Sequence, residues 1–380
     1  MSRKKLLVCL FLLATIFCGS FNVWGSDDVF SVATLNVDGL PSKILFIDSN
    51  PDGPGTSGTN AISRYLCDKG YDIIGVQEDF NYDWELHSFL DAEYDCGMWQ
   101  GDISFSGLSW LIWNTKFETD GLRVFWRKEH TLEHEEAVAW YDSYGRTSNC
   151  WDDMVTKGFR RCEMTLAGGQ RIVVYNMHMD ASTSHDEANG DDGGDRDARR
   201  SQWRQLCAYV LERLDERPIL LIGDMNSLYS RDEIQTLFID PINATGHHRV
   251  YDAWVEDSRQ GVFPPYTGQD RFAAFAMGET FDKILYILPT SGQRLEQLSY
   301  KLENSDYVGD DGTPLGDHFP VSALFKFVET PPSSIVHPMA EQEEIIYDVS
   351  GRQHSSLKKG LRIKKTKEGR IRKVIIFGLR

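Results

Sequence analysis

The chain has 380 residues, with 40 Lys and Arg against 57 Asp and Glu, and a formal net charge of −17. With 41% hydrophobic and 26% charged residues, the composition is that of an ordinary globular protein and excludes a disordered or low-complexity chain. The acidity argues against a passive polyanion binder, because phosphate contacts need Lys and Arg. The acidity does not exclude an enzyme that binds the phosphate of its substrate through a metal ion.

The N-terminus has the pattern of a targeting segment. Arg3, Lys4 and Lys5 precede an apolar run of 14 residues, LLVCLFLLATIFCG, which is shorter than the roughly 20 residues that a membrane span needs. A cut before Ser26 would follow the small residue Gly25. Residues 1–25 are therefore predicted to be a signal peptide, which places the mature protein in the periplasm, at the cell surface or outside the cell. A buried strand and an uncleaved anchor are the alternatives.

Five cysteines remain after such a leader is removed: Cys67, Cys96, Cys150, Cys162 and Cys207. An odd number in an exported protein leaves at least one free thiol. Cys150 and Cys162 are the best candidates for a bridge. The alternative, that most of the cysteines are small buried hydrophobic residues, stays equally open.

Strands are predicted wherever Val, Ile, Leu and aromatic residues cluster between turn signals. In chain order these runs are 29–36, 72–78, 108–114, 159–166, 171–178, 218–226, 283–288 and 319–327. Helical spacing of apolar residues predicts a helix over 197–215, and Ser230 with Glu233 has the form of a capping box that opens a second helix. The segments 50–59 and 185–197 are predicted to be loops.

The composition changes after Pro331-Pro332-Ser333-Ser334. Residues 351–380 carry eleven Lys and Arg and one acidic residue. With the run IIYDVSGRQHSSLKKGLRIKK, this segment resembles the C-terminal tail of exported proteins of Bacteroidetes-type bacteria, which implies sorting or surface attachment. A small β-rich appendage or a basic patch that touches an anionic surface is the alternative. The expected layout is a signal peptide 1–25, a catalytic domain 26–328, a linker 329–340 and a basic tail 341–380.

Polar residues stand at or beside the ends of the predicted strands: Asn36, Glu78, His178, Asp224, Asn226, Asp282, Asp317 and His318. Hard cations such as Mg²⁺ prefer carboxylate and amide oxygens with water. Two histidines and further carboxylates beside such a cation would support metal-assisted phosphoester hydrolysis. Each residue alone also fits a solvated charge, a structural histidine or a tight turn. The hypothesis therefore rests on the whole set of residues in its order along the chain.

Taken together, the motifs TLNVDG, GVQED, NMHMDA, GDMNS, FDKILY and GDHFPV resemble the endonuclease/exonuclease/phosphatase superfamily, in family order over residues 30–328. That metal-dependent group includes pancreatic deoxyribonuclease, apurinic endonucleases, inositol polyphosphate phosphatases and neutral sphingomyelinases. The resemblance implies an α/β fold, a four-layer α/β sandwich of two packed, mostly antiparallel sheets flanked by helices. One departure is Gly316, which stands where the last motif usually has Ser.

The resemblance also implies a role for each residue. The metal ligands would be Glu78, Asn36 and Asp317, and the cofactor would be Mg²⁺, with Mn²⁺ as the alternative. His318 would be the general base, and Asp282 would hold its other ring nitrogen. Asp224 would orient the attacking water, and Asn226 and His178 would donate hydrogen bonds to the phosphate oxygens.

Within the superfamily, KGFRRCEMTL (157–166) and the Arg/Gln-rich segment after the histidine motif resemble the exported, sphingomyelinase-like branch. Lys157 would contact the substrate phosphate; a surface lysine before a strand is the alternative. The favoured function is a Mg²⁺-dependent phosphodiesterase that acts on a phospholipid head group by in-line attack of water. A secreted endonuclease and a phosphatase for inositol phosphates or other small phosphates stay open.

The charge distribution bears on these alternatives. The leader contributes +3 and residues 331–380 contribute +6, so the region between them carries −26. A nuclease should offer a basic groove to its substrate, and this balance weighs against nucleic acid as the partner. A binding protein on a degenerate scaffold would have lost Glu78, Asp224 or His318, and all three are present. We expect a monomer, with the basic tail available for surface association.

Overall fold

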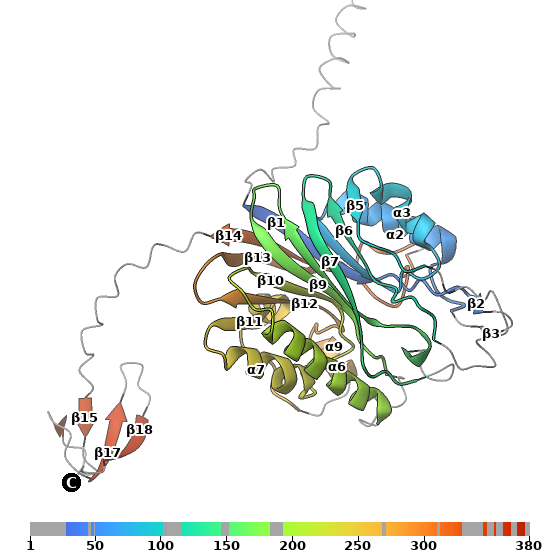
Figure 1. Ribbon diagram of the computed structural model, residues 1–380. Coiled ribbons are helices and arrows are strands. Elements are labelled where there is room, and N and C mark those ends of the chain that lie inside the picture. The colour runs from blue at the N-terminus through green and yellow to red at the C-terminus, as the bar shows by residue number, and fades with distance from the viewer. Residues whose placement is uncertain are drawn as a thin grey trace, which may run out of the picture. The chain divides into compact units, whose positions relative to one another are not determined.

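The computed structural model describes residues 28–44, 47–48, 50–101, 103, 116–145, 152–182, 193–267, 271–309, 312–328, 345–347, 353–354, 360–365 and 371–376. The chain divides into two compact units, Met1–Glu329 and Thr330–Arg380 (Figure 1). The predicted signal peptide 1–25 and the predicted strand 108–114 lie outside the described residues.

The first sheet has the strand order β13-β14-β1-β4-β6-β5. These strands are β1 (Val29–Asn36), β4 (Ile73–Gln77), β5 (Tyr94–Cys96), β6 (Arg123–Arg127), β13 (Arg294–Leu302) and β14 (Val321–Val328). β1 runs parallel to β4, whereas the other neighbours in this sheet are antiparallel. A short hairpin of β2 (Lys43–Ile44) and β3 (Ile47–Asp48) lies outside it.

The second sheet repeats this plan with the order β11-β12-β10-β9-β8-β7. Its strands are β7 (Thr131–Ala139), β8 (Gly158–Thr165), β9 (Arg171–His178), β10 (Ile219–Asp224), β11 (His248–Asp252) and β12 (Asp282–Pro289). Only β9 and β10 are parallel among these described strands. The expectation of two mostly antiparallel sheets is therefore confirmed.

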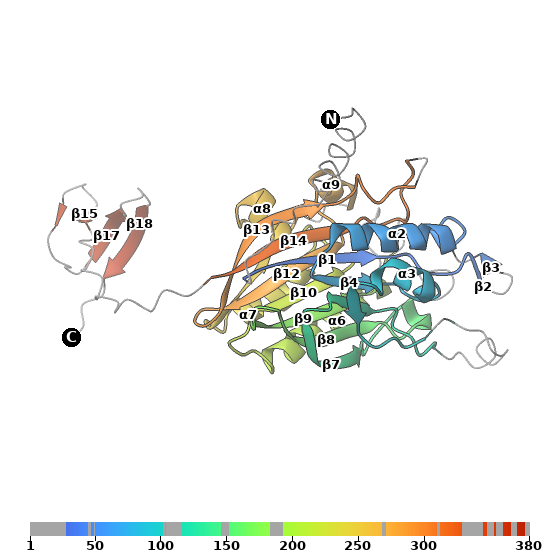
Figure 2. The same ribbon diagram turned by 90° about the horizontal axis from the view of Figure 1, so that it is seen from above.

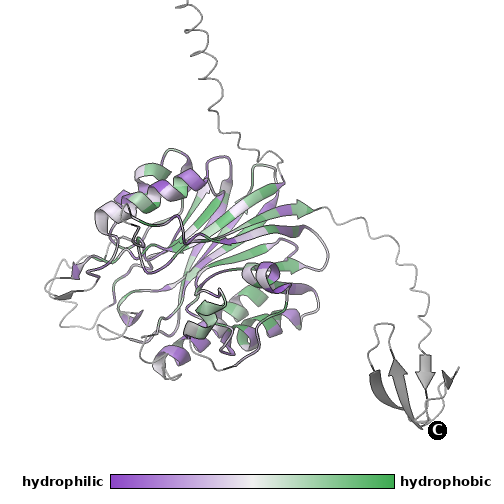
Figure 3. Ribbon diagram, turned by 180° about the vertical axis from the view of Figure 1, so that it is seen from behind, coloured by the Kyte–Doolittle hydropathy of each residue, from purple (hydrophilic) through white to green (hydrophobic). Residues whose placement is uncertain are grey.

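Figures 2 and 3 show the helices on the outer faces of the two sheets, and apolar cores hold these layers together. Between the two sheets lies a core that includes Val32, Val174 and Ile222. On the outer face of the first sheet, a second core joins it to α2 (Gly55–Lys69) and α3 (Asp83–Leu90). On the outer face of the second sheet, a third core includes residues of α6 (Gly194–Leu211), α7 (Asp240–Asn243) and α8 (Ala253–Arg259). The first unit is thus the predicted four-layer α/β sandwich, because each of its two large sheets is covered on both faces.

Shorter helical segments complete the unit. They are η1 (Asp152–Met154), the π-helical turn η2 (Gln235–Ile239) and α9 (Arg271–Ala276). Among the described residues, no helix combines the length and apolarity that a membrane crossing would require.

Two loop predictions were too long. The segment predicted as a loop over 50–59 turns into α2 at Gly55, with Pro54 at the N-cap. A proline suits the start of a helix because its φ is already helical. Likewise α6 begins at Gly194, inside the predicted loop 185–197, and it ends at Leu211 rather than at residue 215.

The predicted capping box is wrong in its contacts. Helical backbone does begin at Glu233, but the Ser230 hydroxyl is buried without a hydrogen-bond partner. The Glu233 carboxylate instead accepts a hydrogen bond of 3.2 Å from the Ser227 hydroxyl and lies 3.5 Å from Arg199 Nε. Tertiary partners have therefore replaced the local cap.

Of the two alternatives for the cysteines, the structure shows a buried free thiol at Cys162 and not a bridge to Cys150. Cys162 lies in β8, where its free thiol is fully buried in the core between the sheets. Burial raises the pKa of this thiol well above its ordinary value. Cys67, Cys96 and Cys207 are free as well, whereas Cys150 lies outside the described residues.

The second unit contains a four-stranded antiparallel sheet with the order β16-β15-β17-β18. Its strands are β15 (Ile345–Tyr347), β16 (Gln353–His354), β17 (Gly360–Lys365) and β18 (Ile371–Ile376). The sorting role of this basic tail stays a prediction.

Candidate active site

The strand registers bring the predicted site residues to one edge of the sandwich. In the second sheet, Asp224 at the end of β10 is directly opposite both His178 of β9 and Asp282 of β12. In the first sheet, Asn36 at the end of β1 is opposite Gln77, the residue before Glu78. Residues that are far apart in the sequence therefore meet because neighbouring strands end at the same level.

The amide of Asn36 joins the two sheets at this edge. Its Nδ2 donates a hydrogen bond of 2.9 Å to Glu78 Oε1 and another of 3.2 Å to Asp224 Oδ2. Its Oδ1 accepts a hydrogen bond of 2.9 Å from the backbone N–H of Asp38, and its own N–H lies 3.4 Å from Asp282 Oδ1. Asn36 thus fixes two carboxylates of the site and the turn that follows β1.

The backbone is unusual where three site loops leave their strands. Asp38, Glu78 and Asn226 have φ values of 51°, 59° and 44°, in the left-handed region that residues other than glycine rarely adopt. In a regular strand, Glu78 would point away from Gln77. The left-handed turn instead directs the Glu78 carboxylate to the same side, toward Asn36. Strained backbone of this kind is concentrated at functional sites.

Negative charge accumulates around Glu78. Burial and the nearby Asp317 raise the pKa of Glu78, whereas Lys157 opposes the shift. Burial, Glu78 and Asp317 raise the pKa of Asp38 to about 8. Carboxylates that repel one another in a buried place are stabilised by a cation.

The oxygen donors fit a magnesium site of the open kind. Among the described residues, no group of three His, Cys, Asp or Glu side chains forms a closed metal cage. Mg²⁺, however, is usually held by only one or two carboxylates with water and substrate phosphate. Glu78 matches that smaller requirement, and the Asp317 carboxylate stands nearby with 76% of its side chain exposed. Asn36 would join as a ligand through its Oδ1, which accepts the N–H of Asp38 in this structure while its Nδ2 donates to Glu78.

His318 is held by a carboxylate on one ring nitrogen and faces the site with the other. Its Nδ1 makes a short hydrogen bond to Asp282 Oδ2, whereas its Nε2 lies 3.7 Å from Asp224 Oδ2 and 3.9 Å from Asp317 Oδ1. Burial alone would lower the pKa of this imidazole, but the carboxylates of Asp282 and Asp224 together raise it well above the ordinary value. The carboxylates therefore favour the protonated ring, and His318 must first lose the proton on Nε2 before it can accept one from water.

His178 lies on the other side of Asp224 and is completely buried. Its Nε2 is 2.9 Å from Lys157 Nζ, 3.4 Å from Asp224 Oδ2 and 3.9 Å from Glu78 Oε1. Burial and the positive charge of Lys157 lower the pKa of His178 well below the ordinary value. The pKa values of the two histidines of the site are therefore shifted in opposite directions.

Lys157 is not a surface lysine. Its ammonium is buried and forms a close ion pair with Asp152, and the carbonyl of Met179 lies 3.4 Å away. Although burial lowers the pKa of Lys157, the carboxylates of Asp152 and Glu78 raise it overall, so the ammonium stays charged. It stands directly behind His178, with its three donors directed at neighbouring protein atoms.

Asp224 and Asn226 form the turn after β10. Asp224 Oδ1 accepts a hydrogen bond of 3.0 Å from the N–H of Asn226, and Asn226 Nδ2 donates one of 3.1 Å to the carbonyl of Met179. Burial raises the pKa of Asp224 to about 6, and His318 opposes the shift. Gly223 makes the turn feasible because its φ of 136° and its approach to Met177 leave no room for a side chain.

Sequence reasoning missed three carboxylates around this site, namely the half-buried Asp38 and the buried Asp152 and Asp180. Asp38 and Asp180 stand inside the quoted motifs TLNVDG and NMHMDA, where each follows a chosen residue by two positions. Burial and the neighbouring Asp152 raise the pKa of Asp180 to about 9. Asp38 and Asp180 could have been found in the sequence, because each lies two positions beyond a polar residue at a strand end.

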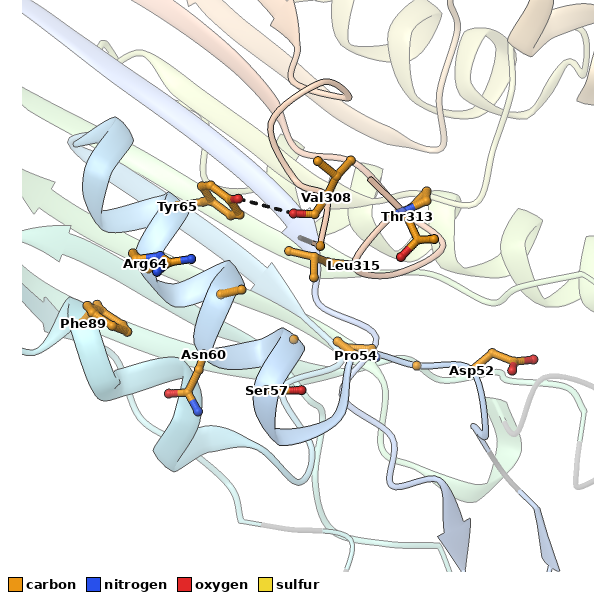
Figure 4. A pocket seen from close by; sticks show the side chains of 15 residues that line it. Asp52, Pro54, Ser57, Asn60, Arg64, Tyr65, Phe89, Val308, Thr313 and Leu315 are labelled. Carbon is orange, nitrogen blue, oxygen red and sulfur yellow. Dashed lines mark hydrogen bonds between the residues drawn. The ribbon is translucent and has the colours of Figure 1, made fainter. Parts of the chain in front are cut away.

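A hollow lies beside α2, and Figure 4 shows the side chains that line it. It is a cavity of about 480 Å³ between α2 and residues 308–309 and 313–315, which precede Asp317 in the chain. Its lining includes Ser57, Asn60, Arg64, Phe89 and Leu315. Tyr65 spans one side of it and donates a hydrogen bond of 3.3 Å to the carbonyl of Val308. This contact links α2 to the chain that leads into the site.

Comparison of the fold with solved structures identifies its class. An endonuclease/exonuclease/phosphatase from Bacteroides vulgatus aligns with a TM-score of 0.50 at 16% identity, over 79% of this chain and 99% of that one. TDP2 from D. rerio, in complex with a single-stranded DNA product, aligns with a TM-score of 0.52 at 15% identity, over 78% and 99%. The chain therefore has the endonuclease/exonuclease/phosphatase fold, as the motifs predicted.

Comparison of the sequence leads to one branch. No family model matches the chain. Sphingomyelinases of Mycobacterium bovis and Mycobacterium tuberculosis are 26% identical to it over 326 residues, which is 83% of this chain and 56% of theirs. The predicted resemblance to the sphingomyelinase-like branch is confirmed, although the chain spans only about half the length of these relatives. An origin in a Bacteroidetes-type bacterium stays a prediction.

Proposed function

We propose that this chain is an exported, Mg²⁺-dependent phosphodiesterase that hydrolyses a phospholipid of the sphingomyelin type by in-line attack of water on phosphorus. The observation that carries the proposal is the edge at which the His318–Asp282 pair and the Glu78–Asn36 pair both approach Asp224. One pair is built to move a proton, and the other offers oxygen ligands to a cation. Phosphoester hydrolysis needs both within a few ångströms.

Glu78 and Asn36, with Asp317 at the rim, would hold the metal ion. When bound, Mg²⁺ would supply positive charge against the charge that builds on the phosphoryl oxygens and would lower the pKa of water. Mn²⁺ accepts the same oxygen ligands. Removal of the metal by a chelator is expected to abolish hydrolysis.

The proton steps fall to the histidine and aspartate groups. His318 Nε2 takes a proton from the attacking water, while Asp282 holds Nδ1 and keeps the ring in its orientation. Asp224 Oδ2, 3.7 Å from that Nε2, is placed to orient the water. Asn226 would donate a hydrogen bond to the charge that grows on the phosphoryl oxygens. His178 would do the same only through an Nε2–H, and this requires the Lys157 ammonium, which donates to Nε2 in this structure, to turn away.

Lys157 supports this arrangement from behind. Its ammonium lies 2.9 Å from His178 Nε2 and is anchored by Asp152, so it holds the imidazole against Asp224 and Glu78. The predicted contact between Lys157 and the substrate phosphate would require Nζ to leave Asp152. We therefore propose positioning of His178 as the principal role of Lys157.

A lipid surface suits the surroundings of the site better than a polyanion does. Tyr144, Phe275 and Met277 expose 51%, 38% and 49% of their surfaces. Tyr144 is held by its N–H to Asp180, and Phe275 packs on Phe281, the residue before Asp282, with ring centroids 5.2 Å apart. Exposed apolar side chains beside a site favour contact with a membrane or another apolar surface, and the net acidity disfavours nucleic acid.

A parallel assay of the purified full chain tests the proposal. Sphingomyelin vesicles, double-stranded DNA and an inositol phosphate would each be offered with Mg²⁺ and with a chelator. Release of phosphocholine only in the presence of the metal, without nicking of the DNA, is the expected result. DNA nicking alone would replace the lipid proposal with the endonuclease alternative, and phosphate release from the inositol phosphate alone would replace it with the phosphatase alternative.

The lipid surface itself is tested with Phe275→Ser and Met277→Ser. Both should lower hydrolysis of vesicles more than hydrolysis of sphingomyelin dispersed in detergent. Leu298→Ser is the matched control, because Leu298 is 45% exposed but lies in the edge strand β13. Equal losses in all three variants would show that the apolar residues beside the site have no special part in binding the lipid.

A further inference from the structure

A polar layer lies directly beneath the site, inside the core between the sheets. It consists of Thr34, Gln77 and Asn176, which are all completely buried, and we call these three residues the polar tie. Gln77 Nε2 donates hydrogen bonds of 2.6 Å to Asn176 Oδ1 and 2.9 Å to Thr34 Oγ1. Asn176 Nδ2 in turn donates bonds of 2.9 Å to the carbonyls of Val76 and Arg123.

The polar tie crosses from one sheet to the other. Thr34 and Gln77 belong to β1 and β4 of the first sheet, whereas Asn176 belongs to β9 of the second. The two carbonyls that Asn176 reaches lie on β4 and β6, so one side chain of the second sheet bonds to two strands of the first.

Each member of the polar tie stands just before a site residue. Side chains two positions apart in a strand share a face, so Thr34 lies under Asn36, and Asn176 lies under His178. Gln77 immediately precedes Glu78. The layer below the polar tie is apolar, with Val32 and Val174 as the preceding residues on the same two faces.

The chain makes room for this layer. Gly75 of β4 faces the same space, and a Cβ there would lie 2.9 Å from Asn176 Oδ1 and 2.6 Å from Ile222 Cδ1. Amides cost free energy to bury unless their hydrogen bonds are satisfied, and apolar side chains would fill the space without that requirement. Apolar packing is non-directional, however, whereas hydrogen bonds fix both distance and angle. A directional link is useful where two sheets must be held in register.

We propose that Thr34, Gln77 and Asn176 are positioning residues that set the separation of Glu78 from His178 across the two sheets. The proposal rests on the proposed function, because it concerns the geometry of that site. A satisfied buried network rigidifies its surroundings, and a shift of about 1 Å at a catalytic group can cost roughly a hundredfold in rate.

The test compares three variants of the full chain: Thr34→Val, Thr34→Ser and Val32→Ala. Thr34→Val keeps the shape but removes the hydroxyl that accepts the hydrogen bond from Gln77. Thr34→Ser keeps the hydroxyl. Val32→Ala is the matched control, because it opens a cavity in the same strand and face, one layer farther from the site. We would measure kcat and KM on sphingomyelin vesicles, the Tm, and the rise of the Tm on addition of Mg²⁺.

Thr34→Val is expected to lower kcat about tenfold with little change in KM and to reduce the rise of the Tm with Mg²⁺. Thr34→Ser should restore both properties. Val32→Ala should lower the Tm at least as much as Thr34→Val does, yet keep kcat within about twofold of the parent. The difference between Thr34→Val and Val32→Ala separates positioning from stability.

The inference is overturned if Thr34→Val keeps its kcat, or if Val32→Ala loses as much kcat as Thr34→Val at a similar Tm. Failure of the proposed function gives a different result, because the parent chain would then hydrolyse no sphingomyelin. The effect of Mg²⁺ on the Tm of the parent and of Thr34→Val still reports on the polar tie in that case, and an equal rise in both would overturn it.

Discussion

The two sheets contribute to the site in different ways. The second sheet supplies His178, Asp224 and Asp282 as neighbours in a regular strand ladder. The first sheet supplies Glu78 from a left-handed turn after β4, and Asn36 from the end of β1 holds it in place. A non-glycine residue in that conformation costs of the order of 1–3 kcal/mol. His178, Asp224 and Asp282 thus lie on regular strand backbone, whereas the proposed principal metal ligand, Glu78, lies on strained backbone.

Glu78→Ala should give the largest effect. It removes the carboxylate that the left-handed turn of the first sheet contributes to the site. Loss of the proposed principal metal ligand is expected to lower turnover by about three to four orders of magnitude, because metal stabilisation of the transition state is worth several kcal/mol. The rise of the Tm with Mg²⁺ should disappear as well. Undiminished turnover by the folded variant would remove Glu78 from the mechanism.

His318→Ala removes the proposed general base, which comes from the loop before β14 of the first sheet and is held by Asp282 of the second. Its loss should lower turnover by about a hundred- to a thousandfold. Unlike Glu78→Ala, this variant should keep the rise of the Tm with Mg²⁺, because Glu78 and Asn36 remain. If the rise of the Tm with Mg²⁺ disappears in both variants, Glu78 and His318 do not have separate roles in metal binding and proton transfer.

Most of the central strands could be predicted from the sequence, although the interior strand β6 was missed. β1 and β9 were predicted to the residue, since both are buried on each face and read as nearly continuous apolar runs. The edge strands β7 and β13 were missed. Their sequences TLEHEEAVA and RLEQLSYKL are rich in charge, and pairing with one neighbour holds them in the sheet. Charged side chains protect an exposed edge strand from pairing with other chains. The same charged residues prevent its prediction from clusters of apolar residues.

The site was only partly predictable for a similar reason. Strand ends located Asn36, Glu78, His178 and Asp224, because a change from apolar to polar is visible in the sequence. Asp152 could not be found in this way, since its burial and its ion pair with Lys157 depend on packing between η1 and β8. The roles assigned to these residues stay predictions.

Lys157→Met tests how the buried charges support the site. Removing one partner of a buried ion pair leaves Asp152 uncompensated and should cost about 3–5 kcal/mol of unfolding free energy. The double variant Lys157→Met with Asp152→Leu should recover most of that loss, because no buried charge is left unpaired. Denaturant unfolding of the single and double variants measures this. Equal stability of the two would show that the pair is not the source of the cost.

Gly316→Ser should have the smallest effect, and it tests the one departure from the family motif. A Cβ at Gly316 would lie 3.4 Å from the Cβ of Asp38 and 3.7 Å from its Oδ2, which is ordinary contact without a clash. Stability should therefore change by no more than about 0.5 kcal/mol, and turnover by less than about twofold. A large loss of turnover at unchanged Tm would mean that the short distance between this loop and Asp38 is tuned for catalysis. The position of the loop that carries Asp317 and His318 would then depend on the strained turn of the first sheet. The proposed metal ligand and the proposed general base would not act independently in that case.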